Sequence, residues 1–470
     1  MKKVILLDPL SYLNNSFGHS HFVRDWSGSR LPADVYLPPL DLMFAAAYLR
    51  QHGYLVKIIE ASAKHMAHAK VAKIVEQENP DFVLIPTVSF DMESDKRLAY
   101  LIRESSPKVK LIFSGPLVTF DPAGVLLDKT ADFVIIGELE MPLLDIVKGN
   151  CAENVAYLDN QGAVIIGRRS LLDLNELPLP ARDLIDNQIY NYAVFNKRNP
   201  ITAMILSRGC PHSRCEFCHT NLYTLGQIRY RNLQAITDEI QELVFKYKIG
   251  EVFFRDQCFT ANRELILKLC DFLISNKINL VWRAETRVDL VDKELLALMN
   301  RAGCYQLSFG FESSSQTSLD LNNKGIRLEQ SRQAAQLAKQ AGIEVVGLFL
   351  YGMLGDTKES MAGLVNFALG LNVDYANFEP IHFMPGTPVY EKMVKGRESI
   401  FFTKEVLKIH VKNAYLKFYF RPAFMYKHLV RIIRSGSFRQ IQVALKVVLS
   451  AFLFFLSLDS SSFGMSSRKK

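Results

Sequence analysis

The stretch TAMILSRGCPHSRCEFCH, residues 202–219, decides how the rest of the chain is interpreted. It begins as an apolar run typical of a buried strand and ends in a loop with three cysteines, Cys210, Cys215 and Cys218. The whole chain of 470 residues has only seven cysteines, so three within nine positions are a local concentration of thiols. Clustered thiols of this kind usually bind a metal or take part in redox chemistry.

An iron–sulfur cluster fits these three thiols better than a zinc ion. Structural zinc sites use four ligands, usually in two separated pairs. His219 offers a fourth ligand, but it follows Cys218 directly and would have to fold back onto the same metal. Thiolates favour iron–sulfur chemistry, and three ligands leave one iron open for a substrate or cofactor. The loop therefore predicts a three-cysteine cluster site, with zinc or a metal-free cysteine-rich loop as the alternatives.

The region 197–395 alternates apolar strands with helices. The strand candidates are short apolar runs at 202–209, 251–256, 280–286, 305–313, 345–353 and 375–383. Helical stretches at 292–303 and 328–342 each end at a glycine, the usual residue just beyond a helix. This alternation predicts a partial (βα)6 barrel, similar to a TIM barrel, with its chemistry at the C-terminal ends of the strands. The three cysteines follow the first strand at that end.

Residues 1–150 show the same alternation. The strand candidates are 4–9, 56–61, 81–89, 109–115 and 131–137, with helices at 40–54 and 94–107. Uninterrupted apolar strands predict an α/β domain with a doubly wound, Rossmann-like parallel sheet covered on both faces. Such sheets bind ligands at the C-terminal ends of their strands. The loops expected there are Asp8-Pro9, Thr87-Val88-Ser89, Ser114-Gly115-Pro116 and Gly137-Glu138.

Two further segments complete the chain. Residues 151–196 are predicted to be a connector, because ELPLPARDLID at 176–186 contains prolines that disfavour helix and strand alike. Residues 396–470 are predicted to be a basic, helical tail. Between Lys404 and Leu458 the tail has ten Lys or Arg residues and one acid, Glu405, while the net charge of the whole chain is +8. The partner implied by the charge is therefore a partner of the tail.

The basic tail predicts contact with an anionic membrane surface. Basic residues beside an apolar segment are attracted to anionic lipid. The apolar run at 447–458 is about twelve residues, well short of the roughly 20 that a spanning helix needs. A packed helix with a solvated basic face is the alternative. No nucleic-acid partner is expected, because the sequence offers no recognisable nucleic-acid-binding module.

The composition is that of a globular protein, and the reducing cytoplasm is the expected compartment because no signal peptide is recognised. Hydrophobic residues make up 49% of the chain and charged residues 22%. The start MKKVILLDP is interpreted as a buried first strand rather than a signal peptide, because its apolar run is only about five residues long. The remaining cysteines are expected to be buried free thiols; they are Cys151, Cys258, Cys270 and Cys304.

The chain resembles the radical S-adenosylmethionine (SAM) superfamily, and in the order of its regions the cobalamin-binding class, which includes anaerobic magnesium-protoporphyrin monomethyl ester cyclases and methyltransferases. The resemblance covers roughly residues 1–395. It rests on the joint order of PPLDLMFAAAYLRQHGY, SGPLVTF, IIGELE, LPARDL, SRGCPHSRCEFC, FFRDQCFT, ETRVDLV, LSFGFES, YGMLGDT and MPGTPVYE.

The resemblance implies three cofactors: a [4Fe-4S] cluster, SAM and cobalamin. The cluster would cleave SAM with an electron from a donor such as flavodoxin or ferredoxin, and the resulting 5′-deoxyadenosyl radical would abstract a hydrogen atom from the substrate. The outcome would be C-methylation, cyclisation or rearrangement of a small or lipophilic substrate. Cobalamin would bind in the first region, through Ser114, Gly115, Pro116, Gly137 and Glu138.

The resemblance also assigns roles in the second region. Cys210, Cys215 and Cys218 match the cluster ligands. Phe217 lies where the family has an aromatic residue near the adenine of SAM, and Glu312 in FGFES matches an acid that contacts SAM. The further candidates for cofactor binding follow the other strands; they are Asp256, Glu285, Arg287 and Gly352. Glu285 and Arg287 are close enough in sequence that pairing with each other is the structural alternative.

Three features depart from the family pattern. Four residues separate Cys210 from Cys215 where relatives have three; one extra residue adds at most about 3.5 Å of reach, which a loop can absorb. The Asp-x-His-x-x-Gly motif that supplies a histidine to cobalt in many cobalamin domains is not present. His65 and His68, in AKHMAHAK, are expected on a solvated helix face. Leu139 replaces a glycine and adds bulk near the expected ligand edge.

Two other functions compete with this one. A protein that kept the scaffold as a binding or regulatory module would hold no cluster. An RNA methylthiotransferase would carry three more cysteines in its first domain, whereas Cys151 is the only cysteine before residue 210.

Overall fold

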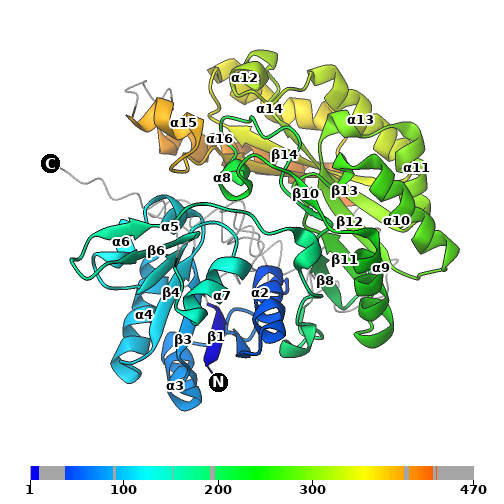
Figure 1. Ribbon diagram of the computed structural model, residues 1–470. Coiled ribbons are helices and arrows are strands. Elements are labelled where there is room, and N and C mark those ends of the chain that lie inside the picture. Colours follow the sequence, from blue (N-terminus) through cyan, green and yellow to red (C-terminus); the bar gives the residue numbers. More distant parts are fainter. Residues whose placement is uncertain are drawn as a thin grey trace. The chain divides into compact units, whose positions relative to one another are not determined.

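The computed structural model describes residues 2–9, 37–87, 92–151, 153–190, 196–395, 402–426 and 430 (Figure 1). These residues fall into two compact units, which separate between Phe195 and Asn196. Each unit has its own parallel sheet and its own apolar core. This confirms the predicted class: an α/β protein with a first parallel-sheet domain followed by a second sheet of six parallel strands.

The first unit is built on a seven-stranded sheet in the order β2-β1-β3-β4-β5-β6-β7. The first five strands are parallel; they are β1 Lys3–Asp8, β2 Leu55–Glu60, β3 Phe82–Pro86, β4 Lys110–Ser114 and β5 Phe133–Ile135. The hairpin of β6 Val155–Leu158 and β7 Val164–Ile166 adds antiparallel strands beside β5. The predicted connector, 151–196, thus begins with two strands of the first sheet.

Helices cover both faces of this sheet (Figure 1). On one face lie α2 Leu40–Gln51 and α7 Glu140–Lys148, and on the other lie α3 His68–Glu78 and α4 Met92–Ser105. Two short helices, α5 Pro116–Phe120 and α6 Ala123–Leu126, follow β4. Parallel strands buried on both faces must be apolar throughout, which explains the uninterrupted runs in the sequence.

The sequence pattern predicted that His65 and His68 lie on a solvated helix face, but the structure does not place them on one. His65 is exposed in a turn with a positive φ of 48°. His68 is the first residue of α3 and is 7% exposed, with its Nε2 3.4 Å from the hydroxyl of Ser94. Because α3 begins only at His68, the preceding residues cannot present a common helical face.

The second unit is built on a six-stranded parallel sheet whose strands follow one another in chain order from β8 to β15. They are β8 Ile201–Met204, β11 Glu251–Phe254, β12 Val281–Thr286, β13 Cys304–Glu312, β14 Glu344–Tyr351 and β15 Tyr375–Pro380. The edge strands β8 and β15 do not pair with each other, so the sheet is an open part of a barrel. A separate two-stranded ribbon pairs β9 Ser207–Arg208 with β10 Arg229–Tyr230.

Helices return the chain after each strand of the second sheet. They are α8 Thr220–Thr224, α9 Leu233–Gln241, α10 Arg263–Ser275, α11 Lys293–Arg301, α12 Gln316–Leu321, α13 Leu328–Gln340, α14 Lys358–Gly370 and α15 Pro388–Tyr390. Several begin at a side chain that accepts a backbone N–H in the first turn, such as Asn232, Asn262 and Asp292. Because every crossover is of this kind, all six strands end at one edge of the sheet.

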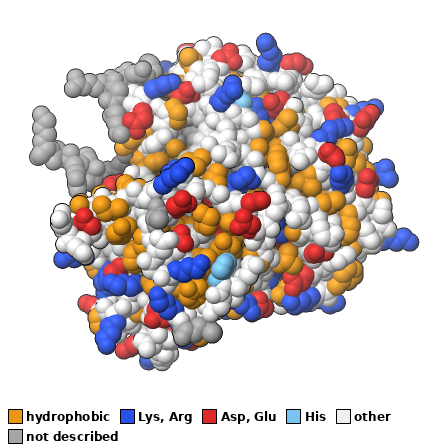
Figure 2. Space-filling view, in the orientation of Figure 1, with side chains coloured by type: hydrophobic (Ala, Val, Ile, Leu, Met, Phe, Trp, Pro, Cys, Tyr) orange, Lys and Arg blue, Asp and Glu red, His pale blue; other side chains and the backbone are white. Residues whose placement is uncertain are grey.

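The first part of the basic tail is a packed helix, α16 Lys404–Tyr419. The hydroxyl of Tyr419 donates to the carbonyl of Ala376 in β15 at 2.7 Å, and Phe418 is fully buried. Most of the tail, including the apolar run at 447–458, lies outside the described residues. None of the helices in the described ranges has the length and apolar character needed to cross a bilayer. On the face drawn in Figure 2, basic and acidic side chains are interspersed over the described residues.

Candidate active site

The cysteine loop leaves the second sheet at a point fixed by a buried carboxylate. Asp256, which follows β11, is 1% exposed and accepts from the backbone N–H of Leu206 at 3.1 Å and of Ser207 at 2.6 Å. It also accepts from the Ser207 hydroxyl at 2.5 Å. Burial raises the pKa of Asp256 to about 6 against the opposing effect of these hydrogen bonds. The carboxylate therefore positions the strand end, and its contact with a cofactor stays a prediction.

A buried ion pair holds Ile205, the residue before the two whose backbone N–H groups Asp256 binds. Arg231 donates through one nitrogen to the carbonyl of Ile205 at 2.9 Å and to the carboxylate of Glu239 at 2.6 Å. Both charged side chains are fully buried. Together with Asp256, this pair fixes three successive backbone positions, 205–207, directly before the cysteines.

Gly209 then allows the chain to turn towards the first cysteine. Its φ is +110°, and a Cβ at this position would lie 2.1 Å from the carbonyl oxygen of Gln227. Its N–H donates to the side chain of Gln257 at 2.9 Å. Only glycine fits this close approach of two backbones.

A tight turn absorbs the extra residue between Cys210 and Cys215. Ser213 has a left-handed φ of 45°, and its hydroxyl donates to the carbonyl of Cys210 at 2.5 Å. The side chain of Asn221 donates to the carbonyl of Ser213. The ring Nε2 of His212 lies 2.5 Å from the carbonyl oxygen of Asn323. Since a carbonyl oxygen only accepts, Nε2 must carry the proton. The four-residue spacing is thus a hydrogen-bonded turn.

A second loop, residues 322–325, supports the far side of the cysteine loop. The N–H of Glu216 donates to the carbonyl of Asn322 at 3.0 Å, and the side chain of Asn323 donates to Glu216 at 2.7 Å. Lys392 pairs with the other oxygen of Glu216 at 2.9 Å. The segment between Cys215 and Cys218 is therefore held by backbone and side-chain contacts together.

The chemistry of the three thiols fits a cluster. All three are free and partly buried. Burial raises the pKa of Cys215 to about 12, while the nearby Lys324 ammonium acts to lower it. Burial also raises the pKa of Cys218. A buried thiolate needs a compensating positive charge, which iron supplies when it displaces the proton. In the described ranges, no three His, Cys, Asp or Glu side chains converge as they would around one metal ion. A [4Fe-4S] cluster would bind Cys210, Cys215 and Cys218 through separate iron atoms.

Glu312 lies beside this loop because the end of β13 is bulged. The pairing with β14 shifts between Gly310 and Glu312, and Glu312 itself has a left-handed φ of 62°. A bulge re-aims a strand-end side chain. Here it directs the carboxylate back over the strand, where Oε1 lies 2.6 Å from the Nζ of Lys324.

Arg287 and Glu285 occupy the same edge but do not pair with each other in the contacts of the structure. Arg287 forms two hydrogen bonds with Asp289, at 2.9 and 3.0 Å, and donates to the carbonyl of Lys324 at 3.1 Å. Burial raises the pKa of Glu285, while Arg255 and Arg283 act to lower it. Glu285 is thus a half-buried carboxylate whose charge is favoured by two guanidinium groups.

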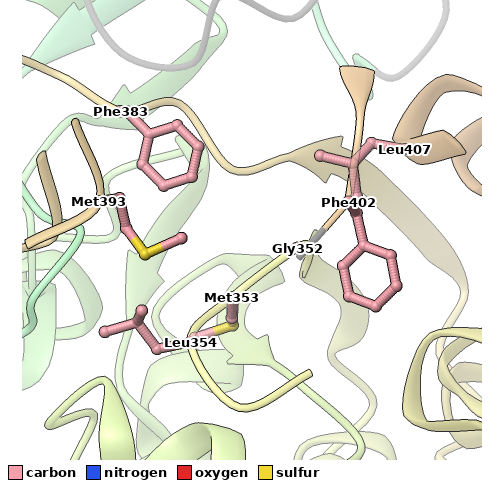
Figure 3. A pocket seen from close by; sticks show the side chains of 7 residues that line it. All are labelled: Gly352, Met353, Leu354, Phe383, Met393, Phe402 and Leu407. Atoms are coloured by element: carbon pink, nitrogen blue, oxygen red, sulfur yellow. The ribbon is translucent and has the colours of Figure 1, made fainter. Parts of the chain in front are cut away.

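Phe217 packs against an apolar cluster near the end of β14, and Gly352 lines a small cavity beside it. Phe217 packs against the buried residues Met353, Ile381, Val389 and Met393. A small cavity with room for about one water molecule, ≈ 10 Å³, lies next to this cluster. Figure 3 shows its lining, which is apolar throughout: Gly352, Met353, Leu354, Phe383, Met393, Phe402 and Leu407.

In the first unit, Ser114-Gly115-Pro116 closes tightly on the neighbouring strand end. Gly115 has φ +124°, and a Cβ there would lie 1.9 Å from the carbonyl oxygen of Thr87. Pro116 is the first residue of α5, and the N–H of Thr87 donates to the carbonyl of Ser114 at 2.8 Å. The Thr87 hydroxyl is buried and has no hydrogen-bond partner in the described part of the chain. This orphaned hydroxyl, at the ligand edge of the sheet, fits a polar ligand such as the amide side chains of cobalamin.

Gly137 and Glu138 continue the same edge between β5 and α7. Gly137 has φ +97°, and its N–H donates to the hydroxyl of Thr119 at 3.3 Å. Glu138 is half-buried. Leu139 has ordinary helical backbone angles and is 9% exposed. Its side chain is therefore buried. Because these backbone angles are open to any residue, leucine fits at this position where relatives have glycine. The candidate Val88-Ser89 part of the neighbouring loop lies outside the described residues.

Two sequence families match the two units in order. Residues 31–147 match the B12 binding domain, and residues 204–368 match the Radical SAM superfamily. The chain belongs to the B12-binding radical SAM family. It is a radical SAM enzyme with a B12-binding domain, and the family's cofactors are a [4Fe-4S] cluster, SAM and cobalamin.

Relatives of this radical SAM enzyme include methyltransferases and cyclases. An uncharacterized methyltransferase of Pyrococcus horikoshii is 27% identical over 83% of this chain and 90% of the relative. The anaerobic magnesium-protoporphyrin IX monomethyl ester cyclase of Rubrivivax gelatinosus is 27% identical over 76% of this chain and 66% of the cyclase. The solved methyltransferase TsrM of Kitasatospora setae, with cobalamin and a [4Fe-4S] cluster bound, shares the fold with a TM-score of 0.65 at 16% identity, covering 84% of this chain and 75% of that one.

Several residues of the site had no recognisable signal in the sequence. Lys324, Arg231 and Glu239 are charged residues whose partners are distant in sequence or lie on a neighbouring element. The turn NNKG at 322–325 is the one clue that the sequence offers, because asparagine and glycine favour tight turns. In the structure Asn323 and Gly325, on either side of Lys324, both have positive φ, so the lysine is held in a rigid loop.

Proposed function

We propose that this radical SAM enzyme uses cobalamin to methylate, cyclise or rearrange a small or lipophilic substrate. The observation that carries the proposal is the cysteine loop at the C-terminal edge of the second sheet, flanked by the Glu312–Lys324 pair and Arg287. In this proposal residues 197–395 hold the cluster and SAM, and residues 1–150 hold cobalamin.

Each residue at this edge has a proposed task. Cys210, Cys215 and Cys218 would hold the cluster, which supplies an electron to SAM when bound. Glu312 would accept hydrogen bonds from the ammonium or ribose hydroxyls of SAM, and Arg287 would face its carboxylate. The apolar cluster around Phe217 would exclude water from the adenine side. Asp256 would act through the loop it positions, and Gly352 would admit the close approach of the cofactor.

In the first unit, the proposed cobalamin contacts come from backbone and small side chains. Ser114, Gly115 and Pro116 would line one side of the ligand edge, and Gly137 and Glu138 the other. The buried Thr87 hydroxyl would donate to the ligand. These residues provide hydrogen bonds and shape rather than a histidine to cobalt.

The reaction type is tested by the products formed from SAM. Protein reconstituted anaerobically with iron, sulfide and hydroxocobalamin is incubated with SAM and dithionite. Methylation predicts that both S-adenosylhomocysteine and 5′-deoxyadenosine accumulate, because one SAM loses its methyl group and another is cleaved. Cyclisation or rearrangement predicts 5′-deoxyadenosine alone. If neither S-adenosylhomocysteine nor 5′-deoxyadenosine accumulates, the proposal is contradicted. Flavodoxin or ferredoxin replacing dithionite tests the proposed electron donor.

We also propose that the tail contacts an anionic membrane surface. Helix α16 carries Lys404, Lys408, Lys412 and Lys417 with a single acid, Glu405. Three of the apolar residues that follow α16 are exposed: Phe420 by 47%, Met425 by 54% and Tyr426 by 72%. Co-sedimentation with vesicles containing phosphatidylserine, but not with neutral vesicles, is the expected result. Equal sedimentation with both kinds of vesicle, or with neither, would contradict it.

A further inference from the structure

The ion pair of Lys324 and Glu312 is buried to an unusual degree. The two side chains are 9% and 10% exposed, and Nζ lies 2.6 Å from Oε1. Lysine is seldom buried unless it is paired. Burial acts to lower the pKa of Lys324, but the neighbouring Glu312 and Cys215 side chains raise it above its usual value. The ammonium group is therefore held charged beside the cysteine loop.

The fold is built to place this ammonium. A Cβ on Gly310 would lie 2.5 Å from Oε1 of Glu312 and 2.8 Å from Nζ of Lys324, so the pair occupies space that only glycine leaves open. The backbone N–H of Lys324 donates to the carbonyl of Leu319 at 2.9 Å, and its carbonyl accepts from Arg287 at 3.1 Å. Lys324 is thus fixed both at its backbone and at its side-chain end.

The position of Lys324 matters for a redox group. The same loop, residues 322–325, supports His212 and Glu216, which flank the cysteine ligands. The N–H of Glu216, the residue after Cys215, donates to the carbonyl of Asn322 at 3.0 Å, so the loop that carries Lys324 lies against the cysteine loop. The Lys324 ammonium acts to lower the pKa of Cys215. A cluster that accepts one electron gains one negative charge. A buried cation nearby favours that reduced form, because charges interact strongly where water is excluded.

We propose that Lys324 is a positioning residue that raises the reduction potential of the cluster, and that Glu312 moderates this effect by pairing with it. The inference rests on the proposed function, because it requires a cluster on Cys210, Cys215 and Cys218. One electron enters from an external one-electron donor, and no bond forms or breaks in this step. The charge of Lys324 sets how easily that electron is accepted.

The test is a redox titration of the reconstituted full-length protein, in which electron paramagnetic resonance measures the reduced cluster at each potential. In Lys324→Met, the ratio of reduced to oxidised cluster at a fixed potential should fall about tenfold, equivalent to ~59 mV for one electron. Lys324→Arg should restore most of the ratio, because it keeps the charge. Glu312→Gln should shift the ratio the opposite way, because it removes a negative charge. Iron and sulfide content is measured for every variant.

The matched control is Lys339→Met. Lys339 also pairs with a carboxylate in the second unit, Asp374 at 3.4 Å, but Asp374 precedes β15 and so lies at the opposite edge of the sheet. Its variant should titrate as the unchanged protein does. An unchanged potential in Lys324→Met overturns the inference. If Lys324→Met takes up no iron, Glu312→Gln decides: a higher potential supports the inference and an unchanged one overturns it. Failure of the unchanged protein to bind a cluster would instead overturn the proposed function.

Discussion

A buried ion pair holds the strand end before the cysteine loop in place. Glu239 and Arg231 are both fully buried, and Arg231 also binds the carbonyl of Ile205. Removing one partner of a buried pair leaves the other charge without compensation. Glu239→Gln should therefore lower the free energy of unfolding by about 3–5 kcal/mol in urea denaturation. Arg332→Met, which breaks the exposed pair with Glu329, should leave it within error. Equal effects of the two changes would contradict this account.

Asp256 should give the protein a distinct pH dependence. Its pKa of about 6 in the folded protein lies above the usual value of 3.8 for an aspartate, so the folded state binds its proton more tightly than the unfolded state. The stabilisation is fully present below pH ~4 and is lost as the pH rises through about 6, by up to about 3 kcal/mol. Asp256→Asn should remove this component when unfolding free energies are compared between pH 4 and pH 7. The same pH slope in both proteins would be the contrary result.

Ser213 should tolerate only residues that suit its turn. Its φ of 45° is left-handed, which glycine adopts freely and β-branched residues avoid. Ser213→Gly should keep most of the iron bound after reconstitution, although the hydrogen bond to Cys210 is lost. Ser213→Val should lose most of it. Iron analysis beside the cluster absorbance measures both, and equal retention in the two variants would show that the turn is not needed.

The sequence predicts which residues are candidates for binding the cofactors better than it predicts the contacts that hold those residues in position. The three cysteines are predicted from a local motif that follows a strand, and Glu312 and Arg287 from their places after strands in the family pattern; their roles stay predictions. Lys324 and Asp256 hold partners 12 and 50 residues away, and spacing in a sequence says nothing about such contacts. The pairing of Arg287 with Asp289 rather than Glu285 likewise depends on where the strand ends.

Among the elements, the loop after β4 makes the sharpest demand on one residue. A Cβ on Gly115 would lie 1.9 Å from the carbonyl oxygen of Thr87, and its φ is +124°. Gly115→Ala should therefore shift this loop, lower the thermal midpoint and reduce the cobalamin retained after reconstitution. Gly370→Ala, at the end of α14 with no atom within 4 Å of the new Cβ, is the control. Cobalamin absorbance and melting measure both, and a normal cobalamin content in Gly115→Ala would contradict the proposed contact.

Long, apolar elements are predictable and short or exposed ones are not. The parallel strands were located within a few residues because most of their residues are apolar and follow one another without interruption, and strands such as β1 and β11 are buried over nearly their whole length. The hairpin β6–β7 was missed because Ile165 and Ile166 are 37% and 57% exposed and the strands are only four and three residues long. The bulge that directs Glu312 arises from pairing with β14, which no local pattern reveals.

For the whole molecule, the order of two α/β units was predictable from the alternation of strands and helices, and it is matched by two families in the same order. The substrate was not, because substrate contacts come from loops that vary freely on one fold. The proposed cobalamin contacts are harder to predict than the proposed cluster ligands, since they would rest on backbone shape at Gly115 and Gly137 rather than on a metal-binding side chain.

Cys210, Cys215 and Cys218 are proposed to hold a cluster that cleaves SAM. The most direct measurement is iron content and 5′-deoxyadenosine release after anaerobic reconstitution, with SAM and dithionite, for the unchanged protein and for Cys215→Ala. We expect about four iron atoms per chain and release of 5′-deoxyadenosine from the unchanged protein, and the loss of both in the variant. Bound zinc, or an iron-loaded protein that leaves SAM intact, would contradict it.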